Sequence, residues 1–355
     1  MKTDNKIINF TKNNLISILF LLFAIFLVLF TPSNLNAARN GLKLWANNVV
    51  PSLFPFFVAV ELLKHTSLIY IISNKLTKYM KPLFNLPGIS TFPFVMGLIS
   101  GYPIGAKIIS DLYSNNSCTK KEAQSMLSFC NNSGPLFIIG TIGCTFYGSS
   151  TIGVILLITH IMASISIGLI NGFISRLKNK ENFKFDYSNN IKTQNSLFNS
   201  NNKDINFSNL GEVLSSSVFS GIKSILMLGG FVTLFSVILS ILERIKILTI
   251  ISSLLSKLIP LDKELINGFL TGIIEFTNGL NKISLVHQKN ISINLILSAF
   301  VIGFGGISVS LQVSSIISKC HLSIKKYLIS KIFQGILAAF YTLIILSIPM
   351  FNFNI

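Results

Sequence analysis

The chain alternates between long apolar stretches and short polar connections. The apolar stretches cover residues 15–30, 47–63, 91–109, 126–147, 151–174, 218–242, 266–280, 291–317 and 328–350. About 20 apolar residues are needed for a helix to cross the hydrocarbon core of a membrane. The pattern therefore predicts an all-α polytopic membrane protein.

Two of these stretches do not fit simple membrane spans. Glycine, proline or glutamate interrupts them, at Gly97, Gly101, Pro103 and Gly105 in the first and at Gly268, Gly272, Glu275 and Gly279 in the second. Interrupted apolar segments at matching positions of two halves indicate the binding site of a transporter. We expect both stretches to form re-entrant hairpins, which enter and leave the membrane on the same side.

Composition and charge are consistent with this interpretation. Half of the residues are hydrophobic and only 12% are charged, which excludes a soluble globular enzyme and a disordered chain. The formal net charge of +17 could indicate nucleic-acid binding. With the N-terminus in the cytoplasm and both hairpins re-entrant, however, 21 of the 29 Lys and Arg residues lie inside and 8 outside. Lys331 is counted inside, at the end of the connection 319–331, and Arg39 and Lys43 are counted outside, in the connection 31–46. This division follows the positive-inside rule, so the charge indicates topology and not nucleic acid.

A weak internal repeat relates the two halves. Three glycine pairs share an offset of 171 residues: Gly97 with Gly268, Gly101 with Gly272, and Gly134 with Gly305. Upstream, Gly41 matches Gly221 at an offset of 180. Each predicted half contains one span, one hairpin and two further spans. This odd number of crossings predicts an inverted repeat, which is characteristic of secondary transporters.

The predicted organisation has four parts. Residues 1–40 contain a membrane helix, which we read as uncleaved because its apolar run is longer than a signal-peptide core. A first repeat covers 41–176 and a second repeat covers 211–355. The connection 177–210 is rich in Asn, Ser and Lys and is expected to be a cytoplasmic linker.

Polar interruptions of the apolar stretches supply the candidate chemistry. Backbone groups freed at membrane depth are tolerated only inside protein or beside a wet cavity. A capping box at Thr119 and Glu122 begins a helix that we expect to break at the sequence NNSGP, which ends at Pro135. A simple proline kink, with Asn side chains bonding between helices, is the alternative.

The second half offers an acidic residue and a glycine cluster. Glu275 is an ionisable residue in an apolar stretch, which is a functional hypothesis because burying a charge is costly; a position at the water interface is the alternative. Gly305 and Gly306 predict a second broken helix, although small residues also permit close helix packing. The predicted substrate- or ion-binding residues are Glu275, Asn278, Asn131, Asn132, Ser133 and Ser308. The predicted breaks lie at Gly101, Pro103, Gly105, Gly134, Pro135, Gly272, Gly305 and Gly306.

Signatures of enzymes are missing from the sequence. It contains no P-loop, no HExxH, no GxSxG and no glycine-rich dinucleotide fingerprint. The four cysteines show no metal-binding spacing. We therefore expect neither an enzyme, nor a cofactor, nor a bound metal.

Three segments of the first half are similar to a known family. They read NNVVPSLFPFFVAVELL from Asn47, FPFVMGLISGYPIGAKI from Phe92 and SMLSFCNNSGPLFIIGTIG from Ser125. They resemble the YlbJ-type sporulation integral membrane proteins of endospore-forming Firmicutes, and the resemblance extends from Gly41 to Leu346. That family belongs to the Gate, or nucleoside-recognition, group, which includes the gate segments of ferrous-iron transporters and resembles concentrative nucleoside transporters.

The resemblance implies a transporter-like fold and a role in sporulation at spore cortex formation. In the second half, GIIEFTNG around Glu275 resembles the acidic second hairpin of the nucleoside transporters. The first hairpin, GYPIGAK, lacks the acid that those transporters carry, so the resemblance does not imply nucleoside transport. We expect a permease of an unidentified small solute, with a non-transporting scaffold for spore envelope assembly as the alternative.

Localisation and partners follow from the same interpretation. The resemblance and the apolar pattern place the chain in the cell membrane of a spore-forming bacterium, with several spans and a cytoplasmic N-terminus. We expect membrane lipid and the solute as partners. A second copy of the chain, or spore-envelope proteins, are further candidates.

Overall fold

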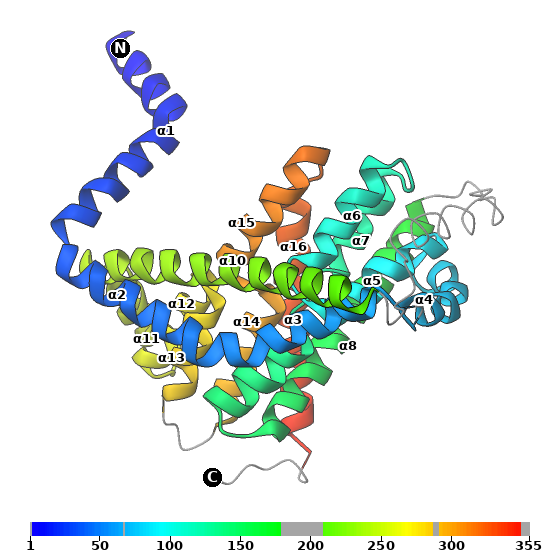
Figure 1. The fold of residues 1–355 in the computed structure, drawn as a ribbon. Coiled ribbons are helices and arrows are strands. Elements are labelled where there is room, and N and C mark those ends of the chain that lie inside the picture. The colour runs from blue at the N-terminus through cyan, green and yellow to red at the C-terminus, as the bar shows by residue number, and fades with distance from the viewer. Residues whose placement is uncertain (1, 67, 179–208, 287–290, 349–355) are drawn as a thin grey trace.

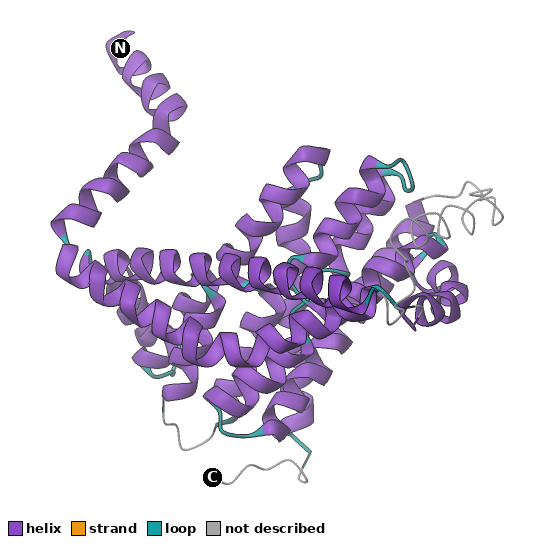
Figure 2. Ribbon diagram, in the orientation of Figure 1, coloured by secondary structure: helices purple, strands orange, loops and turns teal. Residues whose placement is uncertain are grey.

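The described part of the protein consists of helices joined by short loops. The computed structural model describes the chain except residues 1, 67, 179–208, 287–290 and 349–355. No strand occurs in this described part, and short loops join the helices (Figure 2). The predicted linker 177–210 therefore lies almost entirely outside the described residues.

Five helical stretches among the described residues are long and apolar enough to cross a membrane. They cover Thr31–Leu63, Ser150–Leu177, Leu210–Arg244, Ser292–Cys320 and Ile324–Leu346. Residues 74–84 and 88–100 form a sixth candidate, bent by 109° at a short break. The apolar helical stretches 14–29 and 137–146 are shorter than a full span. These lengths confirm the predicted polytopic, all-α fold.

The N-terminal region differs from the prediction in one respect. Residues 31–46 were expected to be an external connection, but the chain is helical from Thr31 to Lys64 through α2 (Thr31–Leu44), η1 (Trp45–Val49) and α3 (Val50–Lys64). The preceding helix α1 (Lys2–Leu29) projects away from the body (Figure 1). It leaves large apolar side chains such as Phe20 and Val28 uncovered, which suits a helix surrounded by lipid.

The two halves have the same order of elements. After α3, the first half contains α4 (Leu68–Tyr79), η2 (Met80–Phe84), η3 (Gly88–Ser90), α5 (Thr91–Ser100), α6 (Ile104–Ser114), α7 (Lys120–Phe129), η4 (Phe137–Phe146) and α8 (Ser150–Lys178). The second half contains α10 (Leu210–Arg244), α11 (Ile247–Leu258), α12 (Lys263–Ile274), α13 (Phe276–Leu285), α14 (Ser292–Phe304), α15 (Gly306–Ile317), η5 (Ser318–Cys320) and α16 (Ile324–Leu346). Each half thus has a long helix, a short amphipathic helix, a helix pair, a broken helix and a final long helix. The short helices α4 and α11 were not foreseen.

Contacts between the first long helices agree with an inverted relation of the halves. The α2–α3 helix and α10 lie side by side across the molecule (Figure 1). A Cβ atom placed on Gly41 would lie 2.6 Å from Ser236 Oγ, and one on Gly221 would lie 3.1 Å from Val58. Gly41 and Gly221 are the pair related by 180 residues. Gly41 packs beside Ser236, which follows Gly221 on α10, and Gly221 packs beside Val58, which follows Gly41 on the α2–α3 helix. Two helices that exchange equivalent contacts in this way run antiparallel about a pseudo-twofold axis.

Both predicted hairpins are present as helix pairs that fold back on themselves. In the first, α5 and α6 are separated by a turn at Gly101, whose φ of 77° suits glycine. Gly97 and Gly105 lie close together across this pair. In the second, α12 and α13 are separated at Glu275, and Gly272 lies against Gly279. The predicted breaks at Gly105 and Gly272 are wrong, because these two glycines lie inside α6 and α12, where they serve close packing. Glycines at these contacts let the two backbones approach closely.

Both predicted broken helices are also confirmed. The capping box at Thr119 and Glu122 begins α7, which ends at Phe129. The chain is non-helical through Ser133 and Gly134, and helix resumes at Pro135. In the second half, α14 ends and α15 begins at Gly305, where a φ of 80° breaks the helix.

Candidate functional site

The four breaks in the helices meet at the centre of the molecule. Within each half, the hairpin tip touches the break that follows it, because Gly101 lies against Gly134 and Phe276, directly after Glu275, lies against Gly306. Tyr102 joins the halves. Its ring meets the ring of Phe276 edge-on at a centroid distance of 6.4 Å. The two hairpin tips therefore contact each other.

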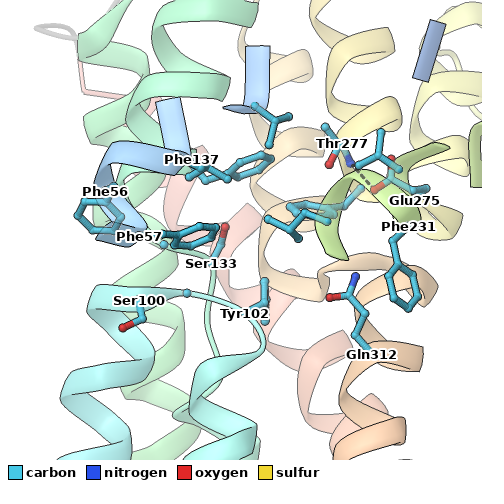
Figure 3. A pocket seen from close by; sticks show the side chains of 17 residues that line it. Phe56, Phe57, Ser100, Tyr102, Ser133, Phe137, Phe231, Glu275, Thr277 and Gln312 are labelled. Atoms are coloured by element: carbon cyan, nitrogen blue, oxygen red, sulfur yellow. Dashed lines mark hydrogen bonds between the residues drawn. The ribbon is translucent and has the colours of Figure 1, made fainter. Parts of the chain in front are cut away.

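A small cavity lies between these breaks and the first long helix of each half (Figure 3). It is lined by Val49, Leu53, Phe56, Phe57, Ser100, Gly101, Tyr102, Ser133, Gly134, Phe137, Leu228, Phe231, Val232, Glu275, Phe276, Thr277 and Gln312. The centres of water-sized molecules have about 40 Å³ within it, which is room for a few waters. A typical small-molecule site offers roughly 300–1,000 Å³. In this conformation the cavity is therefore too small for a typical small-molecule ligand.

Glu275 is the acidic residue of the cavity wall, as the sequence predicts. Only 2% of its surface is exposed. It caps the N-terminus of α13, where its carboxylate accepts hydrogen bonds from the backbone N–H groups of Thr277 (3.2 Å) and Asn278 (2.7 Å). The Asn278 side chain donates a further bond of 2.8 Å and also contacts Ser236 on α10. The positive end of the helix dipole favours a carboxylate at this position.

Two further polar side chains of the cavity wall each carry a buried oxygen that has no hydrogen-bond partner within the described part of the chain. Gln312 Oε1, on α15, and Ser100 Oγ, at the end of α5, are each buried without a hydrogen bond. An unpaired buried polar group costs roughly 1–3 kcal/mol. Such a cost is commonly retained where a ligand or water completes the bond. Neither residue was among the predicted site residues, although both lie in the polar interruptions that the sequence singles out.

The NNSGP break directs most of its polar side chains away from the cavity. Asn132 donates to Phe129 O (2.7 Å) and Ser164 Oγ (3.0 Å), and accepts from Gln334 on α16 at 2.9 Å. Asn131 donates to Tyr327 Oη at 3.0 Å. Both asparagines are fully buried and do not line the cavity. The structure therefore places them in a network that joins α7 to α8 and α16.

Of the three remaining predicted binding residues, one lines the cavity and two lie outside its wall. Ser133 lines the cavity, and its backbone N–H donates to His160 Nε2 on α8 at 3.2 Å. Asn278 supports Glu275 from behind without lining the cavity. Ser308 is buried and its hydroxyl has no partner, but it too lies outside the cavity wall. The breaks thus come together in space, while only Ser133 and Glu275 of the six predicted binding residues face the cavity.

The sequence reasoning missed Lys331. It was counted with the basic residues of a cytoplasmic connection, but it lies within α16 and is fully buried. Its ammonium group donates to the carbonyl oxygen of Asn131, at the NNSGP break, and to Gln334 Oε1. It therefore has to be removed from the charge count that orients the chain. The buried polar residues Tyr327, Lys331 and Gln334 follow one another at helical spacing, and this stripe is a signal that could have identified it.

The fold and the site define a class of protein, namely a polytopic membrane protein with an inverted repeat of hairpins and broken helices around a central cavity. The profile of the Gate family, described as nucleoside recognition, matches residues 46–177. The sporulation integral membrane protein YlbJ of Bacillus subtilis (strain 168) is 30% identical over 345 residues, which cover 94% of this chain and 83% of that protein. The chain belongs to this family of sporulation integral membrane proteins. No solved structure matches it.

Proposed function

We propose that the chain is a permease for a small solute in the membrane of a sporulating cell. The observation that carries this proposal is the position of Glu275, buried at a hairpin tip in the wall of a cavity that is lined by three of the four helix breaks. Transporters with inverted repeats bind their substrates at such breaks and rock one group of elements against the other. The proposed role in sporulation is at cortex formation, as the family resemblance implies.

The polar atoms of the cavity suggest the chemistry of the solute. Glu275 offers carboxylate oxygens, which together can accept about four hydrogen bonds and accept three from Thr277 and Asn278. Gln312 offers an unpaired carbonyl oxygen. The solute would therefore carry hydrogen-bond donors or a positive charge, next to an apolar body that suits the phenylalanines of the wall. Because the cavity is small, binding would require the hairpin tips to separate.

The test is the substitution Glu275→Gln, with Glu264→Gln as the matched control. Glu264 lies on the same helix pair but is exposed. Each variant would replace the native copy in a sporulating host, at equal protein level. We expect a strong loss of heat-resistant spores for Glu275→Gln and none for Glu264→Gln. Purified protein in vesicles should then take up a donor-bearing solute, and normal spore counts with Glu275→Gln would contradict the proposal.

A membrane scaffold is a second candidate, favoured by one observation. The side chains of Asn131 and Asn132 at the first break are satisfied within the protein and do not line the cavity. A scaffold would tolerate Glu275→Gln and would co-purify with a stoichiometric partner of the spore envelope. Solute accumulation by the purified protein in vesicles would decide against it.

We further propose that the N-terminus lies in the cytoplasm. The support is the excess of Lys and Arg in the segments that this orientation places inside. Reporter enzymes that are active on only one side of the membrane, fused at the N-terminus and in the linker 177–210, would check the orientation. Both fusions should report the cytoplasm, and an external signal from either would reverse or rearrange the topology.

A further inference from the structure

Lys331 is a buried basic residue whose surroundings resemble an ion-binding site. It is fully buried, and its ammonium group contacts the Asn131 carbonyl oxygen and Gln334 Oε1, the latter at 2.7 Å. It also lies over the ring faces of Tyr102 and Tyr327, at 5.5 and 5.7 Å from the ring centroids. Within the described part of the chain, no carboxylate forms an ion pair with it. Burying a charge without such a partner is costly, so these ligands must compensate.

The Lys331 ammonium group lies where a cation would bind, at the carbonyl end of a half-helix. Helix α7 ends at Phe129, and Asn131 follows in the non-helical NNSGP segment. The carbonyl end of a helix carries partial negative charge, and unwound carbonyls at such ends coordinate cations in secondary transporters. Asn131 O is a carbonyl of this kind, and it is bonded to Lys331 instead of to another backbone group.

The contacts around Lys331 connect α16 with the first broken helix and with the first hairpin. Tyr102, whose ring lies beneath the ammonium group, is also the residue that meets Phe276 of the second hairpin. Gln334 receives one bond from Lys331 and donates another to Asn132 at 2.9 Å. One side chain of α16 therefore contacts the first broken helix directly and the first hairpin tip through Tyr102.

We propose that the Lys331 ammonium is the resident cation of the first helix break, held where a free metal or organic cation would otherwise be coordinated. Two acceptors and two aromatic faces satisfy the ammonium, as they would a small free cation. The first half therefore needs no coupling ion at this break. This inference does not rest on transport, because it concerns how the break is stabilised in any functional state.

The experiment is to remove the tethered cation and to supply a free one. Lys331→Ala deletes a fragment equivalent to propylammonium and leaves its ligands in place. Thermal unfolding of the purified full chain in detergent is measured with propylammonium or choline chloride at equal ionic strength, and with propanol as the uncharged control. We expect a drop of several degrees in the unfolding midpoint of Lys331→Ala. Propylammonium should restore part of this drop, whereas choline and uncharged propanol should not.

Two further variants make the result decisive. Lys331→Met fills the same space without charge, so it should lower the midpoint and not respond to propylammonium. Lys325→Ala removes an exposed lysine of the same helix and should behave like the native chain. A native midpoint in Lys331→Met would overturn the proposal, because the charge would then be unnecessary. Failure of propylammonium to raise the midpoint of Lys331→Ala above that in choline would also overturn it.

Discussion

The indole N–H of Trp45 donates a hydrogen bond of 2.9 Å to the carbonyl oxygen of Ile225. These two residues are 180 positions apart, which is the offset that relates Gly41 to Gly221. A residue thus bonds to its own counterpart in the other repeat, as happens only where a pseudo-twofold axis passes. The axis runs between the α2–α3 helix and α10.

This hydrogen bond places the Trp45 side chain between the two long helices. Its ring lies against Gly229 on α10, one helical turn beyond Ile225. The absence of a side chain at Gly229 leaves room for the indole against α10. At this point of the crossing, a large side chain therefore packs on a residue that has none.

Filling the space beside Trp45 should destabilise the crossing of the two long helices. A Cβ atom on Gly229 would lie 2.5 Å from Trp45 Cε2, whereas one on the adjacent Gly230 would meet nothing within 4 Å. We expect Gly229→Ala to lower the free energy of unfolding by roughly 1–3 kcal/mol. Gly230→Ala should have little effect. Unfolding midpoints of the two purified variants check the difference, and equal midpoints would mean that this contact does not matter.

The contact between the first hairpin and its broken helix should exclude a side chain at one glycine and accept one at another. A Cβ atom on Gly97 would overlap the carbonyl oxygen of Cys130, while one on Gly134 would meet only ordinary contacts of 3.6 Å. We expect Gly97→Ala to reduce the amount of folded protein in the membrane sharply. Gly134→Ala should accumulate normally, although both glycines belong to the repeat. Quantitative immunoblotting of membranes checks this, and normal accumulation of Gly97→Ala would refute the close approach.

The breaks in the helices could be predicted because their causes are local. Gly101, Pro135 and Gly305 interrupt helices through their own backbone properties, so their positions are evident from neighbouring residues alone. The short helices α4 and α11 were not foreseen because each has only 12 residues. Their mixed apolar and polar faces give no span-length signal. The repeat itself indicated the symmetric arrangement, since two inverted halves must exchange equivalent contacts.

The side-chain network around the first break could not be predicted in the same way. Lys331 and Gln334 reach partners about 200 residues away in the sequence. A count of charges along the chain assigns Lys331 to its neighbours Lys325 and Lys326, which are exposed. Only the fold shows that α16 turns these polar residues toward the NNSGP segment.

Asn132 should act as a structural residue and not as a binding residue. Its side chain makes three hydrogen bonds, to Phe129, Ser164 and Gln334, inside the protein. We expect Asn132→Ala to lower the free energy of unfolding by roughly 1–2 kcal/mol. Spore formation should fall only in proportion to the folded protein that remains. Spore counts plotted against protein level check this, and a loss of function at native protein level would return Asn132 to the binding site.

Gln312 and Ser308 allow structural and functional roles to be separated, because both carry a buried polar atom without a partner on α15. Only Gln312 lines the cavity. Removing an unsatisfied polar group should stabilise the fold, so we expect Gln312→Met and Ser308→Ala each to raise the free energy of unfolding by about 1 kcal/mol. Gln312→Met should nevertheless abolish spore formation, because the cavity loses an acceptor that a solute would use, while Ser308→Ala should sporulate normally. Unfolding midpoints and heat-resistant spore counts, measured on the same variants, check both halves of the prediction. If Gln312→Met were stable and fully functional, the cavity wall at α15 would have no part in recognising a solute.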